Sequence, residues 1–113
     1  NRQEAVLAIA RQCDVFLVVG SQNSSNSRRL AEIAASTGIP SYLVDGPQDV
    51  DLTWFKGKET VGITAGASAP ERLVQECIQL LRENFGATVE EVSLREEHVH
   101  FPLPLELRLA ASK

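Results

Sequence analysis

The chain has 113 residues, the length of a single domain, and 43% of them are hydrophobic, as in ordinary globular proteins. Its formal net charge is −4, 5% of its residues are aromatic, and it holds no basic run and no apolar stretch near the roughly 20 residues of a membrane span. Nucleic-acid binding usually needs a cationic surface and stacking rings, so the charge and the low aromatic content argue against a nucleic-acid partner. The lack of a long apolar stretch argues against a membrane segment.

The first part of the chain predicts a helix, a buried strand and a polar turn. Residues 2 to 12 carry apolar side chains at helical spacing. Residues 15 to 19 are five apolar, mostly β-branched residues, which is typical of a strand buried on both faces. The segment that follows, Gly-Ser-Gln-Asn-Ser-Ser-Asn-Ser at residues 20–27, is named the first turn, and a helical pattern opens after it at Arg28.

A second, shorter strand is predicted in the middle of the chain. Gly38 and Pro40 are signals for the end of the preceding helix, and residues 41 to 44, Ser-Tyr-Leu-Val, follow them. Residues 45 to 47, Asp-Gly-Pro, are typical of a turn, and residues 52 to 55 are expected to form a single helical turn against the core.

The third predicted strand, residues 60 to 64, leads into a second polar segment. This segment, Thr-Ala-Gly-Ala-Ser-Ala-Pro at residues 64–70, is named the second turn. Ser68 as N-cap with Pro70 at the first helical position predicts a helix that runs to about residue 85 and ends at Gly86.

The last part of the chain, residues 88 to 113, lacks a helical pattern. Its apolar residues alternate as in a strand, but Pro102 and Pro104 allow only an edge strand or an extended arm. We therefore expect an α/β domain over residues 1–100 and an extended C-terminal arm over residues 101–113. The domain is expected to be small and three-layered, with a mainly parallel sheet of about four strands and helices on both faces.

The two turns are expected to lie close together. Three parallel strands joined by helices most often take the order 2-1-3, and ligands bind where the strand order reverses, at the carboxyl ends. The first turn follows strand 1 and the second turn follows strand 3, so both would border this crevice. Strand 2 is followed by Asp45, whose negative charge does not suit an anion.

Both turns suit an anion, because each combines hydroxyl groups with the unpaired N–H groups of a helix N-terminus. Plain helix capping by Ser25 or Asn26 and by Ser68 is the alternative. Neither turn contains His, Cys, Asp or Glu, so the turns can hold a phosphate group but offer no general acid, base, nucleophile or metal ligand. We therefore assign no catalytic residue.

The cysteines and histidines give weak signals for a metal. Cys13 and Cys77 are far apart in the sequence and lie on the apolar sides of predicted helices, which favours two buried thiols that behave as small hydrophobic groups. His98 and His100 have a His-x-His spacing, but two ligands without a third are a weak metal site. We interpret them as surface residues.

Three stretches of the sequence, residues 1–6, 18–27 and 61–70, resemble the C-terminal domain of 4-hydroxy-3-methylbut-2-enyl diphosphate reductase. This enzyme is the iron–sulfur reductase that closes the non-mevalonate isoprenoid route. The Asn-Ser-Ser-Asn-Ser and Thr-Ala-Gly-Ala-Ser-Ala-Pro segments are long and unusual, and the resemblance runs through essentially the whole chain, the proline-containing arm included.

The resemblance implies an oxidoreductase made of similar α/β domains around a 4Fe-4S cluster that is bound by cysteines. Such a reductase removes the hydroxyl of an allylic diphosphate substrate as water, with electrons from a donor such as a ferredoxin or flavodoxin, and gives isopentenyl and dimethylallyl diphosphate. It also implies that Ser24, Ser25, Asn26 and Ser68 bind the substrate diphosphate. The expected location is the bacterial cytoplasm, since no signal peptide is visible.

The resemblance further implies that the cluster ligands lie upstream of Asn1, because neither cysteine of the chain takes a ligand position. The chain would then be the last third of the reductase, inactive without the missing N-terminal domains as partners. Two other functions stay open. One is a non-catalytic phosphate- or nucleotide-binding module. The other is an interaction domain whose turns are only helix caps and whose apolar tail, residues 101–109, binds a partner.

Overall fold

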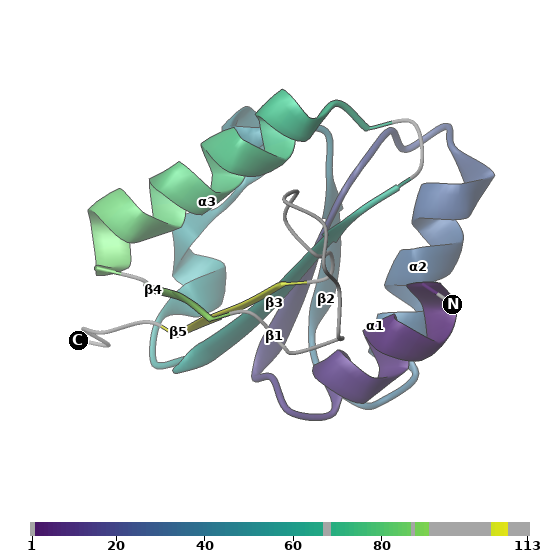
Figure 1. Cartoon of the computed structure of the whole chain (residues 1–113), viewed down its shortest axis with the longest axis horizontal. Coiled ribbons are helices and arrows are strands. Elements are labelled where there is room, and N and C mark those ends of the chain that lie inside the picture. Colours follow the sequence, from purple (N-terminus) through teal and green to yellow (C-terminus); the bar gives the residue numbers. More distant parts are fainter. Residues whose placement is uncertain (1, 67–68, 87, 91–104, 109–113) are drawn as a thin grey trace.

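The computed structural model describes residues 2–66, 69–86, 88–90 and 105–108. Within these residues, three helices and three parallel strands follow one another in the order α1 (Arg2–Ala10), β1 (Val15–Val19), α2 (Ser25–Ala35), β2 (Ser41–Val44), β3 (Thr60–Ala65) and α3 (Glu71–Phe85). Two short 3-10 helices, η1 (Pro47–Asp49) and η2 (Leu52–Phe55), connect β2 to β3. The last elements are β4 (Thr88–Glu90) and β5 (Leu105–Arg108) (Figure 1).

The sheet has the order β2-β1-β3-β5-β4, and β1 is parallel to both of its neighbours. Val19, at the end of β1, pairs with Val44 of β2 on one side and with Ala65 of β3 on the other. The predicted α/β class and the order 2-1-3 are thus confirmed. The three parallel strands end at the same edge of the sheet, which places the start of the first turn beside the start of the second.

The C-terminal strand β5 differs from the sequence prediction. Its residues, Leu105–Arg108, were expected in an arm, but they form a strand between β3 and β4 and are antiparallel to both. The prediction failed because Pro102 and Pro104 were interpreted as excluding an inner strand, whereas both precede the paired residues and remove no hydrogen bond from them. In the described part of the chain the sheet therefore has five strands instead of about four, and the expected boundary at residue 100 lies outside that part.

Helices cover both faces of the sheet, as predicted. In Figure 1, α3 lies on one side of the strands, and α1 and α2 lie on the other. Successive residues of β1 serve the two faces in alternation, since Leu17 is buried in the core beneath α3 and Phe16 in the core beneath α1 and α2. The five apolar residues of β1 are all fully buried, which explains their unbroken hydrophobic run.

The two helices that follow the turns begin at other residues than predicted. α2 begins at Ser25, three residues before Arg28, because Ser24 already serves as its N-cap. α3 begins at Glu71 with Pro70 at the N-cap position, so the expected cap position at residue 68 is not the one used. The predicted end of α3 is confirmed, since Gly86 adopts the left-handed conformation with φ 65°.

Within the described residues, no helix is both long enough and apolar enough to cross a membrane.

Candidate functional site

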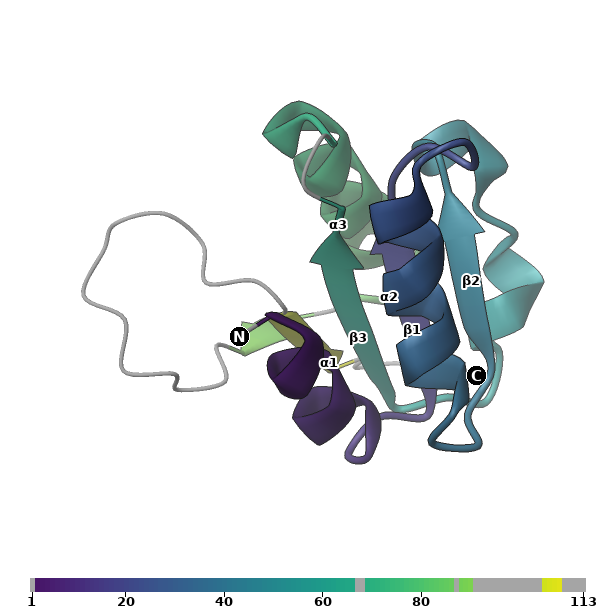
Figure 2. The ribbon, with the colours of Figure 1, turned by 90° about the vertical axis from the view of Figure 1, so that its right-hand side faces the viewer.

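The first turn begins as a direct continuation of the parallel sheet. Gly20 donates its backbone N–H to the carbonyl of Val44 at 2.8 Å, and Gly66 donates to the carbonyl of Val19 at 2.9 Å. Strand pairing therefore extends one residue beyond β1 and β3. In Figure 2 the arrowheads of β2 and β3 point up, toward the N-terminal ends of α2 and α3. The two segments that were predicted to border a crevice thus follow neighbouring strands at the same edge of the sheet.

Ser24 caps the N-terminal end of α2. Ser24 has an extended backbone, with φ −88° and ψ 118°, and its Oγ accepts the backbone N–H of Ser27 at 3.2 Å. The capping role was predicted for Ser25 or Asn26, but these residues occupy the first two helical positions instead. Ser24 is half-buried, whereas the side chains of Ser25 and Asn26 are exposed. Three of the four predicted diphosphate contacts are therefore adjacent at one helix N-terminus.

The fourth predicted contact, Ser68, lies outside the described residues. The neighbouring part of the second turn is described. Asn26 Oδ1 lies 3.4 Å from the position that a Cβ on Gly66 would take, so the two turns approach each other closely. The contact of Ser68 with an anion stays a prediction.

The charges near the first turn favour an anion. Arg28 and Arg29 follow it directly and are exposed. No acidic residue occurs in residues 20–31 or in residues 60–70. The N-terminal end of α2 adds a partial positive charge of its own, whereas the exposed Asp45 follows the neighbouring strand β2.

Sequence reasoning missed two buried hydroxyls close to the two turns. Ser27 and Thr64 are both fully buried. Neither Ser27 Oγ nor Thr64 Oγ1 has a hydrogen-bond partner in the described part of the chain. The helical spacing of Ser27 with Leu30 and Ala34, all on the buried side of α2, was the signal that could have shown Ser27 facing the sheet.

The two cysteines lie on opposite faces of the sheet. Cys13 is buried beneath α1 and α2, whereas Cys77 is buried beneath α3, so the sheet separates them. Burial raises the pKa of the Cys77 thiol to about 12, and nearby acidic charges add to the shift. The structure confirms the prediction that both thiols are buried. No group of three or more potential metal ligands occurs among the described residues, and His98 and His100 lie outside them.

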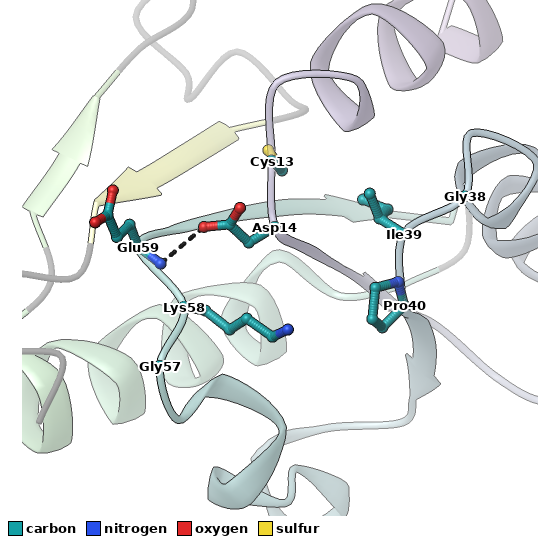
Figure 3. A pocket seen from close by; sticks show the side chains of 8 residues that line it. All are labelled: Cys13, Asp14, Gly38, Ile39, Pro40, Gly57, Lys58 and Glu59. Atoms are coloured by element: carbon teal, nitrogen blue, oxygen red, sulfur yellow. Dashed lines mark hydrogen bonds between the residues drawn. The ribbon is translucent and has the colours of Figure 1, made fainter.

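A pocket of about 410 Å³ lies at the other end of the sheet. It is lined by residues that precede the three parallel strands: Cys13, Asp14, Gly38, Ile39, Pro40, Gly57, Lys58 and Glu59 (Figure 3). The carboxylate of Asp14 is turned toward the backbone of Glu59, which donates to it at 2.9 Å, so this acid has a structural partner. The pocket is remote from the two turns and is not part of the candidate site.

Comparison with known proteins bears on the role of these turns. The family model described as LytB protein matches residues 1–82. The chain belongs to this family. The match includes both turns and the three parallel strands that carry them.

Curated relatives of the LytB family agree in name. The chain is 54% identical to the 4-hydroxy-3-methylbut-2-enyl diphosphate reductase of Azotobacter vinelandii over 112 residues, which are 99% of the chain and 36% of that protein. It is also 54% identical over 108 residues to the reductase of Vesicomyosocius okutanii, with 96% of the chain and 35% of that protein covered. The chain thus spans about a third of the length of these relatives.

Solved LytB structures share the fold. One is the 4-hydroxy-3-methylbut-2-enyl diphosphate reductase described as the terminal enzyme of the non-mevalonate pathway, with 34% identity and a TM-score of 0.70. The match covers 73% of the chain and 29% of that structure. The Plasmodium falciparum reductase gives a TM-score of 0.71, also at 34% identity, and 26% of its chain is covered. The α/β architecture described above is therefore that of one part of a larger reductase.

Proposed function

We propose that this chain forms the diphosphate-holding part of a 4-hydroxy-3-methylbut-2-enyl diphosphate reductase, with Ser24, Ser25, Asn26 and Ser68 as the diphosphate contacts. The observation that carries the proposal is the position of the serine-capped N-terminus of α2 beside the end of β3. Open α/β sheets bind ligands at this place, and helix N-termini bind anions. The names of the LytB relatives, which include a diphosphate, agree with it.

The capped helix start has the right chemistry for phosphate oxygens. Because Ser24 Oγ accepts the N–H of Ser27, its own hydroxyl hydrogen is left to donate to a ligand. Ser25 exposes a second hydroxyl beside it. A hydrogen bond to a charged group contributes roughly 1.5–3 kcal/mol, so a few such donors are enough for micromolar binding before the costs of desolvation and ordering.

The described residues do not fit a 4Fe-4S cluster. Such clusters are held by several cysteine thiolates around one point, whereas Cys13 and Cys77 are buried on opposite faces of the sheet. The raised pKa of Cys77 also disfavours the thiolate that a metal needs. We propose that the cluster of the whole reductase is bound by other segments, and that this chain contributes no group to electron transfer.

The role left to this chain is binding and orientation. We propose that it holds the diphosphate of the allylic substrate, and of the isopentenyl and dimethylallyl diphosphate products, at the crevice. The reacting carbon would then face the remaining domains, which receive electrons from a donor such as a ferredoxin or flavodoxin. Holding the charged end in a fixed position is a contribution to catalysis in its own right, because it lowers the entropic cost of the reaction. The bacterial cytoplasm is the proposed location.

Titration of the ¹⁵N-labelled chain with pyrophosphate, isopentenyl diphosphate and ADP tests the proposal. We expect the largest amide shifts at Ser25 and Asn26 and tighter binding of the two simple diphosphates than of ADP. A preference for ADP would instead indicate a nucleotide-binding module. Absence of binding at millimolar pyrophosphate and sulfate would support a pure interaction domain and would contradict the proposal.

The variant Ser24→Asp separates binding from folding. Aspartate is as good an N-cap as serine, so the thermal midpoint should stay close to that of the wild type. Its carboxylate would stand beside the diphosphate, and we expect the affinity for pyrophosphate to fall at least about tenfold through charge repulsion and loss of the hydroxyl donor. Gln12→Glu adds the same charge at an exposed position near the other end of the sheet and serves as the matched control.

A further inference from the structure

The side chain of Ser27 occupies the space between Gly20 and Gly66, the glycines that directly follow β1 and β3. A Cβ built on Gly20 or on Gly66 would overlap Ser27 Oγ. The same Cβ positions lie 2.8 Å and 3.1 Å from Ser27 Cβ, respectively. Gly20 follows β1 and Gly66 follows β3, so one small side chain of α2 touches the point where each turn leaves its strand.

The oxygen of Ser27 lies nearer to both of these positions than its Cβ does. It is the nearest atom to both Cβ positions, it is fully buried, and it lacks a hydrogen-bond partner in the part of the chain that is described. A buried hydroxyl without a partner costs about 1–3 kcal/mol, a cost that alanine would avoid. Packing in general therefore does not explain serine at this position, whereas filling the gap between the turns does.

We propose that Ser27 is a positioning residue of the anion site, whose side chain, held between Gly20 and Gly66, sets the separation of the two turns. This inference rests on the proposed function. A diphosphate has two charged groups, and both are held at once only when the donors of the two turns are the correct distance apart. Orthophosphate needs the donors of one turn alone. Ser27 therefore determines selectivity for a diphosphate over a single phosphate.

Moving a small side chain from position 27 in α2 to position 66 after β3 tests whether it sets the separation of the two turns. In Gly66→Ala, the new methyl group overlaps Ser27 Oγ and pushes the turns apart. In the double variant Ser27→Gly/Gly66→Ala, that overlap is removed, and the next neighbour of the methyl group is Asn26 Oδ1 at an ordinary 3.4 Å. Gly66 does not have a positive φ, so alanine there is not strained by its backbone.

The readout is the affinity of each chain for pyrophosphate and for orthophosphate, followed by the amide shifts of the ¹⁵N-labelled protein. We expect Gly66→Ala to lose pyrophosphate affinity at least about tenfold, the equivalent of one hydrogen bond to a charged group. Orthophosphate affinity should change less than about threefold. The double variant should recover pyrophosphate affinity to within about threefold of the wild type, because the spacing is restored.

Ala35→Gly places a glycine at an exposed helical position at the other end of α2 and controls for the helix-destabilising effect of Ser27→Gly. Equal losses for both anions in Gly66→Ala, or a double variant that folds with a wild-type thermal midpoint and still binds pyrophosphate as weakly as Gly66→Ala, would overturn the spacing role. If the wild-type chain binds neither anion, the proposed function itself fails. The two failures are therefore distinguishable.

Discussion

Asp14 and Thr60 are joined by hydrogen bonds in both directions. The backbone N–H of Asp14 donates to the carbonyl of Thr60 at 2.9 Å, and the Asp14 carboxylate accepts the N–H of Thr60 at 3.2 Å. The same carboxylate oxygen accepts the N–H of Glu59. One side chain therefore ties the start of β1 to the start of β3, at the end of the sheet opposite the two turns.

Removal of this carboxylate should weaken the pairing of the two central strands. For Asp14→Ala we expect the free energy of unfolding to fall by about 1–3 kcal/mol, because two backbone N–H groups lose a charged acceptor. Urea unfolding measures the change. Asp14→Asn keeps an acceptor oxygen and should lie between alanine and the wild type. Asp45→Ala removes an exposed acid at the other end of the sheet, and a loss as large as that of Asp14→Ala would contradict this account.

Gly62 of β3 has no room for a side chain. A Cβ there would lie 2.5 Å from Cδ1 of Phe16 and 3.0 Å from Sγ of Cys13. We expect Gly62→Ala to lower the free energy of unfolding by about 1–3 kcal/mol through overpacking. The cost should shrink in a Phe16→Leu background, which removes the ring that the methyl group meets. An equal cost in both backgrounds, measured by a double-mutant cycle, would show that the contact is not responsible.

The parts of the fold that follow from local patterns were predictable from the sequence. The five apolar residues of β1 and the glycine at the end of α3 are local signals, and their consequences are visible in the structure. The order β2-β1-β3 followed from the general topology of parallel sheets. β5 was not predictable in this way, because its place between β3 and β4 depends on pairing with residues far away in the sequence.

The candidate site was likewise only partly predictable from the sequence. The residues of the first turn were found from their composition, but their individual roles depend on atomic contacts. The choice of Ser24 as cap and the burial of Ser27 follow from where α2 lies on the sheet, and no spacing rule specifies that position to within one residue. The gap at Gly66 is likewise visible only when both strands and α2 are placed together.

Tyr42 and Trp54 form a parallel stack, with ring centroids 3.9 Å apart and an interplanar angle of 2°. Trp54 is the one tryptophan of the chain, so its fluorescence reports this contact directly. We expect Tyr42→Leu to shift the Trp54 emission to longer wavelength and to cost about 0.5–1.5 kcal/mol of stability, since the stack no longer shields the indole ring. Tyr42→Phe keeps the ring and should leave both values unchanged. A shift of equal size in Tyr42→Phe would assign the effect to the hydroxyl instead.

The buried thiol of Cys77 should make stability depend on pH in the alkaline range. The thiol of the unfolded chain releases its proton near the ordinary cysteine pKa of 9.0, whereas burial raises the pKa in the folded state to about 12. Above pH 9 the unfolded state therefore binds fewer protons than the folded state, and the free energy of unfolding falls as the pH rises toward 12. This contribution is constant below pH 9, where both states hold the proton.

Urea unfolding of the wild type and Cys77→Ala at pH 8 and pH 10 isolates this effect. Alanine leaves a small cavity in the core beneath α3 and should lower stability at both pH values. The difference between the two proteins should shrink at pH 10 by about 1 kcal/mol, because only the wild type loses stability through this thiol, at no more than about 1.4 kcal/mol per pH unit. Parallel pH dependences would mean that the thiol ionises in the folded core as easily as in the unfolded chain. Cys77 would then react with iodoacetamide at pH 8 without unfolding, a reaction that its burial leads us to exclude.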